Sequence, residues 1–228
     1  NNNNEIPKQI SEIKDLKVFI SQKKFFNKEK LKINNLLINK ANFSVQPSDF
    51  SFFNDFINKK FSNKEIKIKN SNIFFKNEKN ETVSITQISR LFLFYDDLEL
   101  LNKITLKGEI FKIPFILKFH RNLLDKQNNM MINSKKLKIK FNNKTNTNNK
   151  IIIGLNDLSI FNMKLITQYE IEDNNLSFQS LKSQLSNNKL EYSGKVNFYP
   201  FDLLLSINLQ KINLKKLFNN NSILFELF

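Results

Sequence analysis

Residues 103–119 read KITLKGEIFKIPFILKF, and residues 189–205 read KLEYSGKVNFYPFDLLL. When the two blocks are aligned, Gly108 and Pro114 fall on Gly194 and Pro200, 86 residues further along the chain. The chain has only three glycines and four prolines, so the shared spacing points to an internal repeat. Repeats at a fixed period are typical of architectures that grow by stacking similar units.

Apolar and polar residues alternate on both sides of the proline in each block. Before the proline the apolar residues stand at even-numbered positions, and after it they stand at odd-numbered positions. Side chains of a strand point alternately to its two faces, so a change of parity indicates a turn or bulge. Proline cannot donate to a β-ladder, and we therefore expect the break at or next to Pro114 and Pro200. Each block is predicted to form a strand, a bend and a second strand.

Length and composition predict a folded β protein. With 228 residues and 40% apolar content, the chain can bury a core and is too apolar for a disordered tail. It starts NNNNEIP and stops at LFELF, so we expect it to be an internal fragment of a longer protein. No run approaches the roughly 20 apolar residues that span a bilayer. The absence of cysteine excludes disulfides and thiolate metal sites, and fits a bacterial envelope or the cytosol.

The net charge of +15 admits three explanations. Asn, Lys, Ile and Phe dominate while Gly, Ala, Trp and Arg are scarce, which is the composition of an AT-rich genome. Many lysines occupy polar positions of alternating stretches, as at Lys32, Lys67, Lys69, Lys138 and Lys140. We therefore favour a solvated strand face over a nucleic-acid patch. Attraction to anionic lipid head groups is a third use of the same charge.

Outside the blocks, apolar alternation predicts further strands and the loops between them. We expect residues 1–15 to be disordered or frayed, and residues 16–228 to form one β segment. The predicted strands lie at residues 17–21, 31–45, 65–77, 83–95, 137–141, 150–172 and 176–181. Residues 122–134 are predicted to be a loop or a disordered crossing, residues 142–149 a low-complexity turn, and residues 214–228 helical turns.

One internal helix is predicted. Pro47–Asp49 provides a helix-start signal, and from Phe50 to Phe61 an apolar residue recurs every third or fourth position. This spacing predicts a short amphipathic helix within residues 49–61. We expect its aromatic stripe to pack against a sheet.

Residues that could carry catalysis are scarce. His120, the one histidine, stands at the end of an alternating stretch, where a solvated side chain is expected, and one histidine cannot build a typical zinc site. Carboxylates cluster at Asp96–Asp97 and at residues 170–173, where turn chemistry explains them more simply than acid–base catalysis. We therefore predict a protein that is not an enzyme, with no cofactor and no metal.

Long amphipathic strands need something to cover their apolar face. Strands of eight to ten residues span about 26–33 Å, and several side by side expose more apolar surface than soluble proteins usually leave open. The possible solutions are a sandwich, a closed barrel, a covering helix, or a curled sheet whose concave side holds apolar ligands. The predicted fold class is mainly β, with long antiparallel strands in a curled, repeat-built sheet and one or two short helices.

The sequence resembles the AsmA-like family of AsmA-, TamB- and YhdP-type chains, most closely those of alphaproteobacteria with AT-rich genomes. The resemblance lies in LKINNLLINKANFSVQPSDFSFF (residues 31–53) followed by IKIKNSNIFF (residues 66–75). It extends to LKGEIFKIPF and YSGKVNFYPF, with DLLLSINLQKINLKKLF after the second. It covers roughly residues 16–228, and its motifs are apolar alternation and a few glycines, with no chemical signature. The chain has fewer glycines than many relatives.

The resemblance implies a periplasmic location in a parent chain that an N-terminal helix anchors in the inner membrane. It also implies a taco-shaped β-groove lined with apolar residues, implicated in intermembrane phospholipid transfer and outer-membrane biogenesis. The implied partners are phospholipid and the bacterial membranes, the latter through parts of the parent chain absent here, with no specific nucleic acid.

We predict that the apolar parity of the two blocks lines this groove. The predicted lipid-binding residues are Ile104, Leu106, Phe115, Leu117, Phe119, Val196, Phe198, Leu203, Leu205 and Ile207. Each of them could equally be ordinary core between two sheets. A second hypothesis is a non-catalytic structural or adhesive β-array of the cell envelope that binds a protein partner. A third is non-specific binding of nucleic acid through the lysines.

Overall fold

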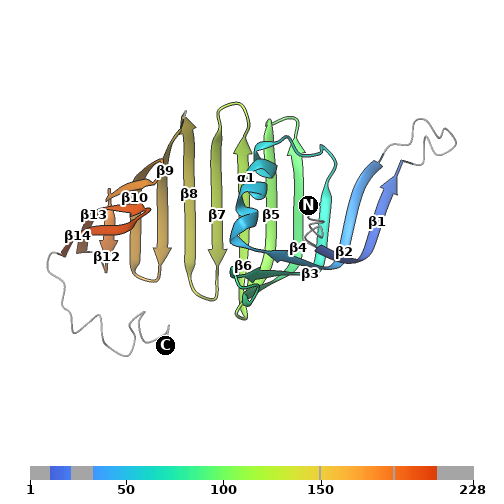
Figure 1. The fold of residues 1–228 in the computed structure, drawn as a ribbon, viewed down its shortest axis with the longest axis horizontal. Coiled ribbons are helices and arrows are strands. Elements are labelled where there is room, and N and C mark those ends of the chain that lie inside the picture. Colours follow the sequence, from blue (N-terminus) through green and yellow to red (C-terminus); the bar gives the residue numbers. More distant parts are fainter. Residues whose placement is uncertain (1–10, 22–32, 149, 187, 210–228) are drawn as a thin grey trace, which may run out of the picture. The chain divides into compact units, whose positions relative to one another are not determined.

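A computed structural model describes residues 11–21, 33–148, 150–186 and 188–209 (Figure 1). They form fourteen β-strands, a 3-10 turn and one α-helix. Every strand pair that we describe below is antiparallel except β2–β3, so the predicted fold class is confirmed. The chain divides into two compact units, residues 1–124 and residues 125–228, and each unit contains one of the two repeat blocks.

The first unit contains six strands in chain order, β1-β2-β3-β4-β5-β6. Their bounds are β1 (Ser11–Ile20), β2 (Ile33–Val45), β3 (Ile66–Lys76), β4 (Thr82–Asp96), β5 (Leu101–Ile110) and β6 (Ile113–Asn122). The parallel pair β2–β3 is connected by the 3-10 turn η3 (Pro47–Asp49) and helix α1 (Phe50–Asn58). Parallel neighbours require such a crossover, because a short hairpin connects only antiparallel strands. The predicted helix is confirmed, and residues 83–95 belong to one long strand.

The second unit contains eight strands. Their bounds are β7 (Gln127–Ser134), β8 (Ile139–Asn148), β9 (Ile151–Ile160), β10 (Met163–Glu172), β11 (Asn175–Ser180), β12 (Ser183–Leu185), β13 (Asn188–Phe198) and β14 (Phe201–Leu209). Strands β11 and β12 both lie between β10 and β13, so they form one interrupted strand. At the interruption the hydroxyl of Ser183 accepts the Ile166 N–H at 2.9 Å. Strand β14 pairs with β13.

Three predictions for polar stretches are wrong. Residues 11–15 belong to β1, because Ser11, Ile13 and Asp15 pair with β2. Residues 127–134 of the expected loop form β7, and the expected turn after residue 141 continues β8 to Asn148. Asparagine and threonine fit these strands because their side chains bond across the sheet: Asn128 Nδ2 donates to Thr145 Oγ1 at 3.1 Å. Residues 1–10 and the predicted helical turns at 214–228 lie outside the described residues.

The two blocks bend at different positions. In the first block, Phe111 and Lys112 form a two-residue turn with φ of 49° and 60°, as in a type I′ hairpin. Pro114 lies beyond this turn, paired with Glu109, so placing the break at or next to Pro114 is wrong. Residues flanking a two-residue turn form a hydrogen-bonded pair, so Pro114 occupies the next, non-bonded pair and the missing N–H costs that ladder nothing. In the second block the prediction is confirmed, because Tyr199 and Pro200 are the turn.

A bend runs across β2, β3 and β4. Lys40 and Asn70, at matching positions of the parallel pair, have φ of 56° and 48°, and the register shifts in β4 after Ile88. Ser71 fills the gap, because its hydroxyl accepts the Ala41 N–H at 3.0 Å and donates to the Lys69 carbonyl at 2.7 Å. Ala41, Ser71 and Ile88 are buried, so the core of the first unit includes this bend.

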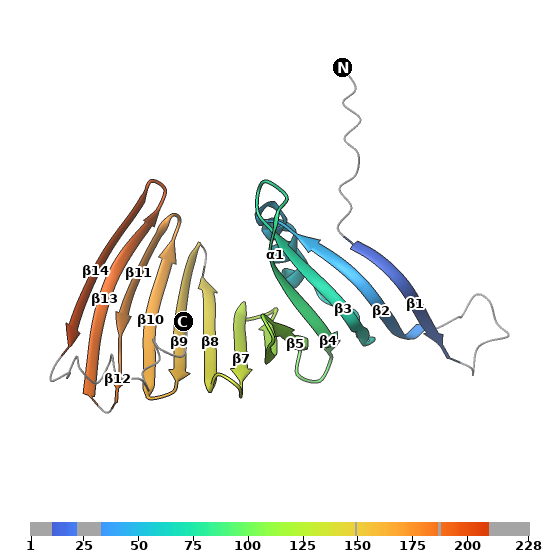
Figure 2. The same cartoon turned by 90° about the horizontal axis from the view of Figure 1, so that it is seen from below.

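Helix α1 lies over the sheet of the first unit (Figures 1 and 2) and is fastened by Asn102. The side chain of Asn102 is fully buried, donates to the carbonyls of Ile57 and Lys59, and accepts the Phe61 N–H at 3.0 Å. The expected packing of the aromatic stripe is wrong for Phe50 and Phe52, whose side chains are 61% and 55% exposed. The apolar side chains of this helix therefore cover a wider part of its circumference than the part that is buried.

Candidate functional site

The strand register brings the five predicted residues of the first block to one face. Ile104 pairs with Phe119 and Leu106 pairs with Leu117, while Phe115 pairs with Gly108. Residues that face each other across an antiparallel pair point to the same side of the sheet. We call this side of β4–β6 the apolar face of the first unit.

The second block repeats this arrangement. Val196 pairs with Leu203, and Leu205 and Ile207 pair with Gly194 and Tyr192. Phe198 pairs with Phe201 on the same side. We call this side of β7–β14 the apolar face of the second unit, and the opposite side of each unit its charged face.

Charges are segregated between the two faces. In the strands β7–β14, register places every charged residue on the charged face: Lys140, Lys144, Asp157, Lys164, Glu170, Glu172, Lys189, Glu191, Lys195 and Asp202. In β4–β6 the apolar face carries a single charge, Arg121, opposite Asn102. Burial lowers the pKa of that guanidinium from its ordinary value. Each of the two apolar faces, one over three strands and one over eight, carries almost no charge and is chemically suited to contact hydrocarbon.

The two apolar faces differ in exposure. In the first block Leu106 is 8% exposed, and the other four predicted residues are partly buried. In the second block Leu203 and Leu205 are each 50% exposed and Ile207 is 54% exposed. Among the described residues, the β14 end of the second unit therefore offers apolar side chains that no second layer covers.

All three glycines lie on the apolar faces beneath an aromatic ring of a neighbouring strand. A Cβ at Gly154 or Gly194 would meet the ring of Tyr169 or Phe178, and the ring of Phe115 lies against Gly108. Glycine in a strand interior is otherwise unfavourable, and a ring that covers it restores the lost apolar contact. These pairs explain the glycines of the repeat blocks as places where a ring packs onto the backbone.

Sequence reasoning missed several residues of the second apolar face. Phe201 pairs with the predicted Phe198 and is 75% exposed, and Tyr169 and Phe178 pair with each other on the same face. Periodicity marks each of them as apolar on its own strand, but only the pairing of strands shows which faces coincide. Phe201 was detectable, because it begins the apolar parity that the prediction followed from Leu203 onward.

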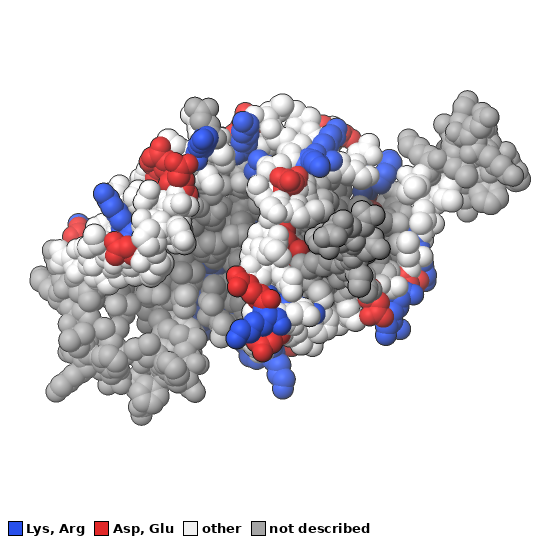
Figure 3. Space-filling view, viewed as in Figure 1, with Lys and Arg blue, Asp and Glu red and all other residues white. Residues whose placement is uncertain are grey.

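The charged faces combine lysines with acidic partners. Lys103 Nζ lies 2.8 Å from both Asp96 Oδ2 and Glu99 Oε2, and its hydrogen bond lowers the pKa of Asp96. Lys164 lies 3.7 Å from Asp157, and Lys189 contacts Glu191. On the side of the molecule shown in Figure 3, basic and acidic side chains are interspersed without a continuous basic patch.

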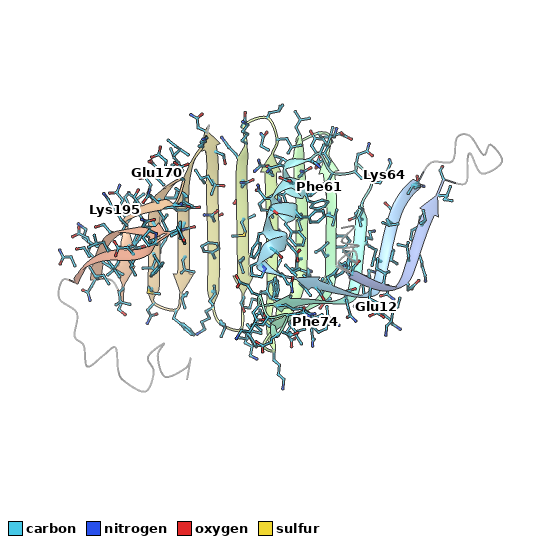
Figure 4. The ribbon with its side chains drawn as sticks, viewed as in Figure 1. Glu12, Phe61, Lys64, Phe74, Glu170 and Lys195 are labelled. Carbon is cyan, nitrogen blue, oxygen red and sulfur yellow. The ribbon has the colours of Figure 1, made fainter. Side chains whose placement is uncertain are left out.

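A shallow hollow of about 530 Å³ lies on the charged face of the second unit. Glu170 and Lys195 lie on its wall (Figure 4), on either side of Ser177 in the register of β10, β11 and β13. Its other charged-face lining is mostly glutamine and serine. This composition suits water and small polar solutes more than hydrocarbon.

The residues considered for catalysis lie apart. His120 lies on the charged face of β6 opposite Lys103, and burial, followed by the charge of Lys103, lowers its pKa below the ordinary 6.5. Asp96 ends β4 and accepts the N–H groups of Leu98 and Glu99, as the turn explanation predicts. The described residues contain no group of three or more histidine or carboxylate side chains arranged to hold a metal ion.

Helix α1, nine residues long, is the one α-helix of the described residues, which include no helix with the length and apolarity needed to cross a bilayer. No protein-family model, curated protein or solved structure matches the chain.

Proposed function

We propose that the apolar faces of the two units shield the acyl chains of phospholipids, and that the protein acts without catalysis as a segment of an AsmA-like envelope protein. In this proposal the parent chain is anchored in the inner membrane and the segment works in the periplasm. The observation that carries the proposal is the segregation of charge in β7–β14, where every charged residue lies on one face.

The energetics favour such a use. Transfer of a methylene group from water to an apolar surface is worth about 0.8 kcal/mol, so a long acyl chain gains several kcal/mol against a continuous apolar face. A single unpaired charge on that face would cancel much of the gain. The exposure of Leu203, Leu205 and Ile207 supports contact with a ligand more than an ordinary core between two sheets.

Strand β14 offers a matched pair of substitutions. Leu204 and Leu205 are neighbours in sequence and are 67% and 50% exposed, but they point to opposite faces. We expect Leu205→Asp to reduce the phospholipid that co-purifies with the chain several-fold, because the carboxylate enters the acyl-contact surface. Leu204→Asp adds the same charge to the charged face and should leave the lipid content unchanged.

Mass spectrometry of extracted lipids measures the ratio of phospholipid to protein, and circular dichroism checks the strand content of each variant. Delipidated protein should also reload from vesicles of dioleoyl phosphatidylglycerol. A wild-type chain that neither carries nor reloads phospholipid contradicts the proposal, as does equal lipid in the two folded variants.

A second candidate function is a structural array that binds protein through strand edges. Among the described strands, β1 pairs only with β2 and β14 only with β13, so each exposes backbone groups along one side. An extended partner segment could add a strand there. Leu204→Pro removes one backbone N–H donor from β14. If this variant loses self-association or partner binding but keeps its lipid, the result favours this candidate.

A further inference from the structure

A row of polar side chains crosses the apolar face of the second unit, which on β7 and β8 also carries Asn128, Ser134, Thr145 and Thr147. It takes one residue from each of five neighbouring strands: Asn143 of β8, Asn156 of β9, Thr167 of β10, Ser180 of β11 and Tyr192 of β13. We call this set the polar row. It runs perpendicular to the strands, with the apolar side chains of Phe141, Leu158 and Leu165 on one side and the rings of Tyr169 and Phe178 on the other.

Hydrogen bonds join the members of the polar row in two groups, Asn143 with Asn156, and Thr167 with Ser180 and Tyr192. Asn143 Nδ2 donates to Asn156 Oδ1 at 2.6 Å and to the Tyr169 hydroxyl at 2.7 Å. The hydroxyls of Thr167 and Tyr192 are bonded to each other, and Ser180 Oγ accepts the Tyr192 N–H at 2.9 Å. The row is therefore ordered before any ligand arrives.

Some hydrogen-bonding capacity of the row is unused. Within the described part of the chain, Asn143 Oδ1 and Asn156 Nδ2 make no hydrogen bond, and both side chains are half-buried and reachable. One of these atoms accepts and the other donates. Phe141 and Leu158 flank the row on one side. On the other side Thr145, Gly154 and the Tyr169 ring flank it, and Ile152 and Ile171 lie one position further along their strands on the same face.

We propose that the polar row binds the uncharged polar part of an amphiphile, its ester carbonyls and hydroxyl groups, while the acyl chains lie on the flanking apolar rows. This inference rests on the proposed function and names the chemical group that the face recognises. Asn156 Nδ2 is placed to donate to an ester carbonyl, and Asn143 Oδ1 to accept from a hydroxyl. No charged side chain shares this face, so a charged head group would find no counter-ion there and remains outside the row.

The arrangement also suits movement across the strands. Neighbouring strands lie about 4.8 Å apart, so each step of that length brings a polar group from one member of the row to the next. A ligand that moves along the row exchanges one hydrogen bond for another at each strand. It does not have to leave a polar group unbonded on an apolar surface.

The experiment compares two lipids that differ only in the ester carbonyl. The full chain is incubated with vesicles that contain equal amounts of dioleoyl phosphatidylcholine and its ether-linked analogue, and the protein-bound lipids are quantified by mass spectrometry. We expect the wild-type chain to enrich the ester lipid about five-fold, the effect of one hydrogen bond. Asn156→Leu should bring the ratio close to one while the total bound lipid stays the same.

Asn146→Leu is the matched control, because Asn146 lies on β8 but on the charged face, and it should keep the wild-type ratio. If Asn156→Leu does not fold, Thr167→Val removes a hydroxyl of the row with little change of shape, and we expect it to lower the ratio. Equal binding of ester and ether lipid by the wild-type chain overturns the polar row as a binding site and leaves the proposed function standing. Binding of neither lipid overturns both.

Discussion

The hairpins β5–β6 and β13–β14 share a sequence pattern but differ in what surrounds them. In the first, Leu106 is buried on a face that α1 and Asn102 help to cover. In the second, Leu205 of β14 lies on the apolar face, paired with Gly194 of β13, and is half exposed. Alternation thus determines which face is apolar, whereas covering elements determine whether that face becomes a core or a surface.

The largest expected effect comes from placing a carboxylate on each hairpin. Leu106→Asp should destabilise the first unit by about 4 kcal/mol or more, because an unpaired charge enters a buried position. Leu205→Asp should change stability by less than about 1 kcal/mol. Urea denaturation followed by circular dichroism measures both, and similar losses would show that the second hairpin is also core.

The cover of the first hairpin is tested by Asn102→Ala. We expect a loss of about 2–4 kcal/mol, because two carbonyls and one N–H in the α1 connection lose a buried partner. Hydrogen exchange should rise over residues 57–61, while residues 188–198 of the second unit keep their protection. Unchanged exchange in the helix connection would contradict the fastening role of Asn102.

Glycine substitutions compare the two faces more finely. At Gly108 an added Cβ would lie 2.6 Å from the Gln87 carbonyl oxygen, which is backbone and cannot easily move, so Gly108→Ala should cost about 2–3 kcal/mol. At Gly154 the added Cβ meets the far end of the Tyr169 ring, which can swing away. Gly154→Ala should therefore cost about 1 kcal/mol, and thermal denaturation of the two variants should rank them in this order.

The smallest expected effect is a pH dependence that belongs to the first hairpin alone. The pKa of His120 is lower in the folded chain than its ordinary 6.5, so below pH 6.5 the unfolded chain binds more protons than the folded one. The contribution of His120 to the free energy of unfolding is therefore complete above pH 6.5, and it decreases as the pH falls toward the folded pKa. His120→Gln should flatten this part of the stability–pH curve, and an unchanged slope would assign it to other groups.

Local pattern in the sequence was sufficient for the fold class and for the membership of the apolar faces. All ten predicted residues share a face within their own hairpin, because a period of two is visible on each strand. The bend at Pro114 was misplaced, since the turn uses Phe111 and Lys112, residues without the usual composition of a turn. The end of β8 was predicted too early, because its second half is polar and belongs to the sheet only through its bonds to neighbouring strands.

The polar row could not be predicted from the sequence. Its members are distant in the chain, and Asn143 lies in a stretch that reads as low complexity. Only the registers of β8, β9 and β10 bring Asn143, Asn156 and Thr167 side by side. Exposure was likewise unpredictable, because it depends on the covering helix and not on the pattern of the strands.

The placement of glycine has a consequence for how this protein could be improved. All three glycines serve beneath rings within strands, while left-handed backbone positions are occupied by bulkier residues such as Leu100, Phe111 and Lys138. Conformations of this kind cost an ordinary residue about 1 kcal/mol relative to glycine. Stability is therefore still to be gained at the rims of the sheet, and engineering there would leave the apolar faces of both units untouched.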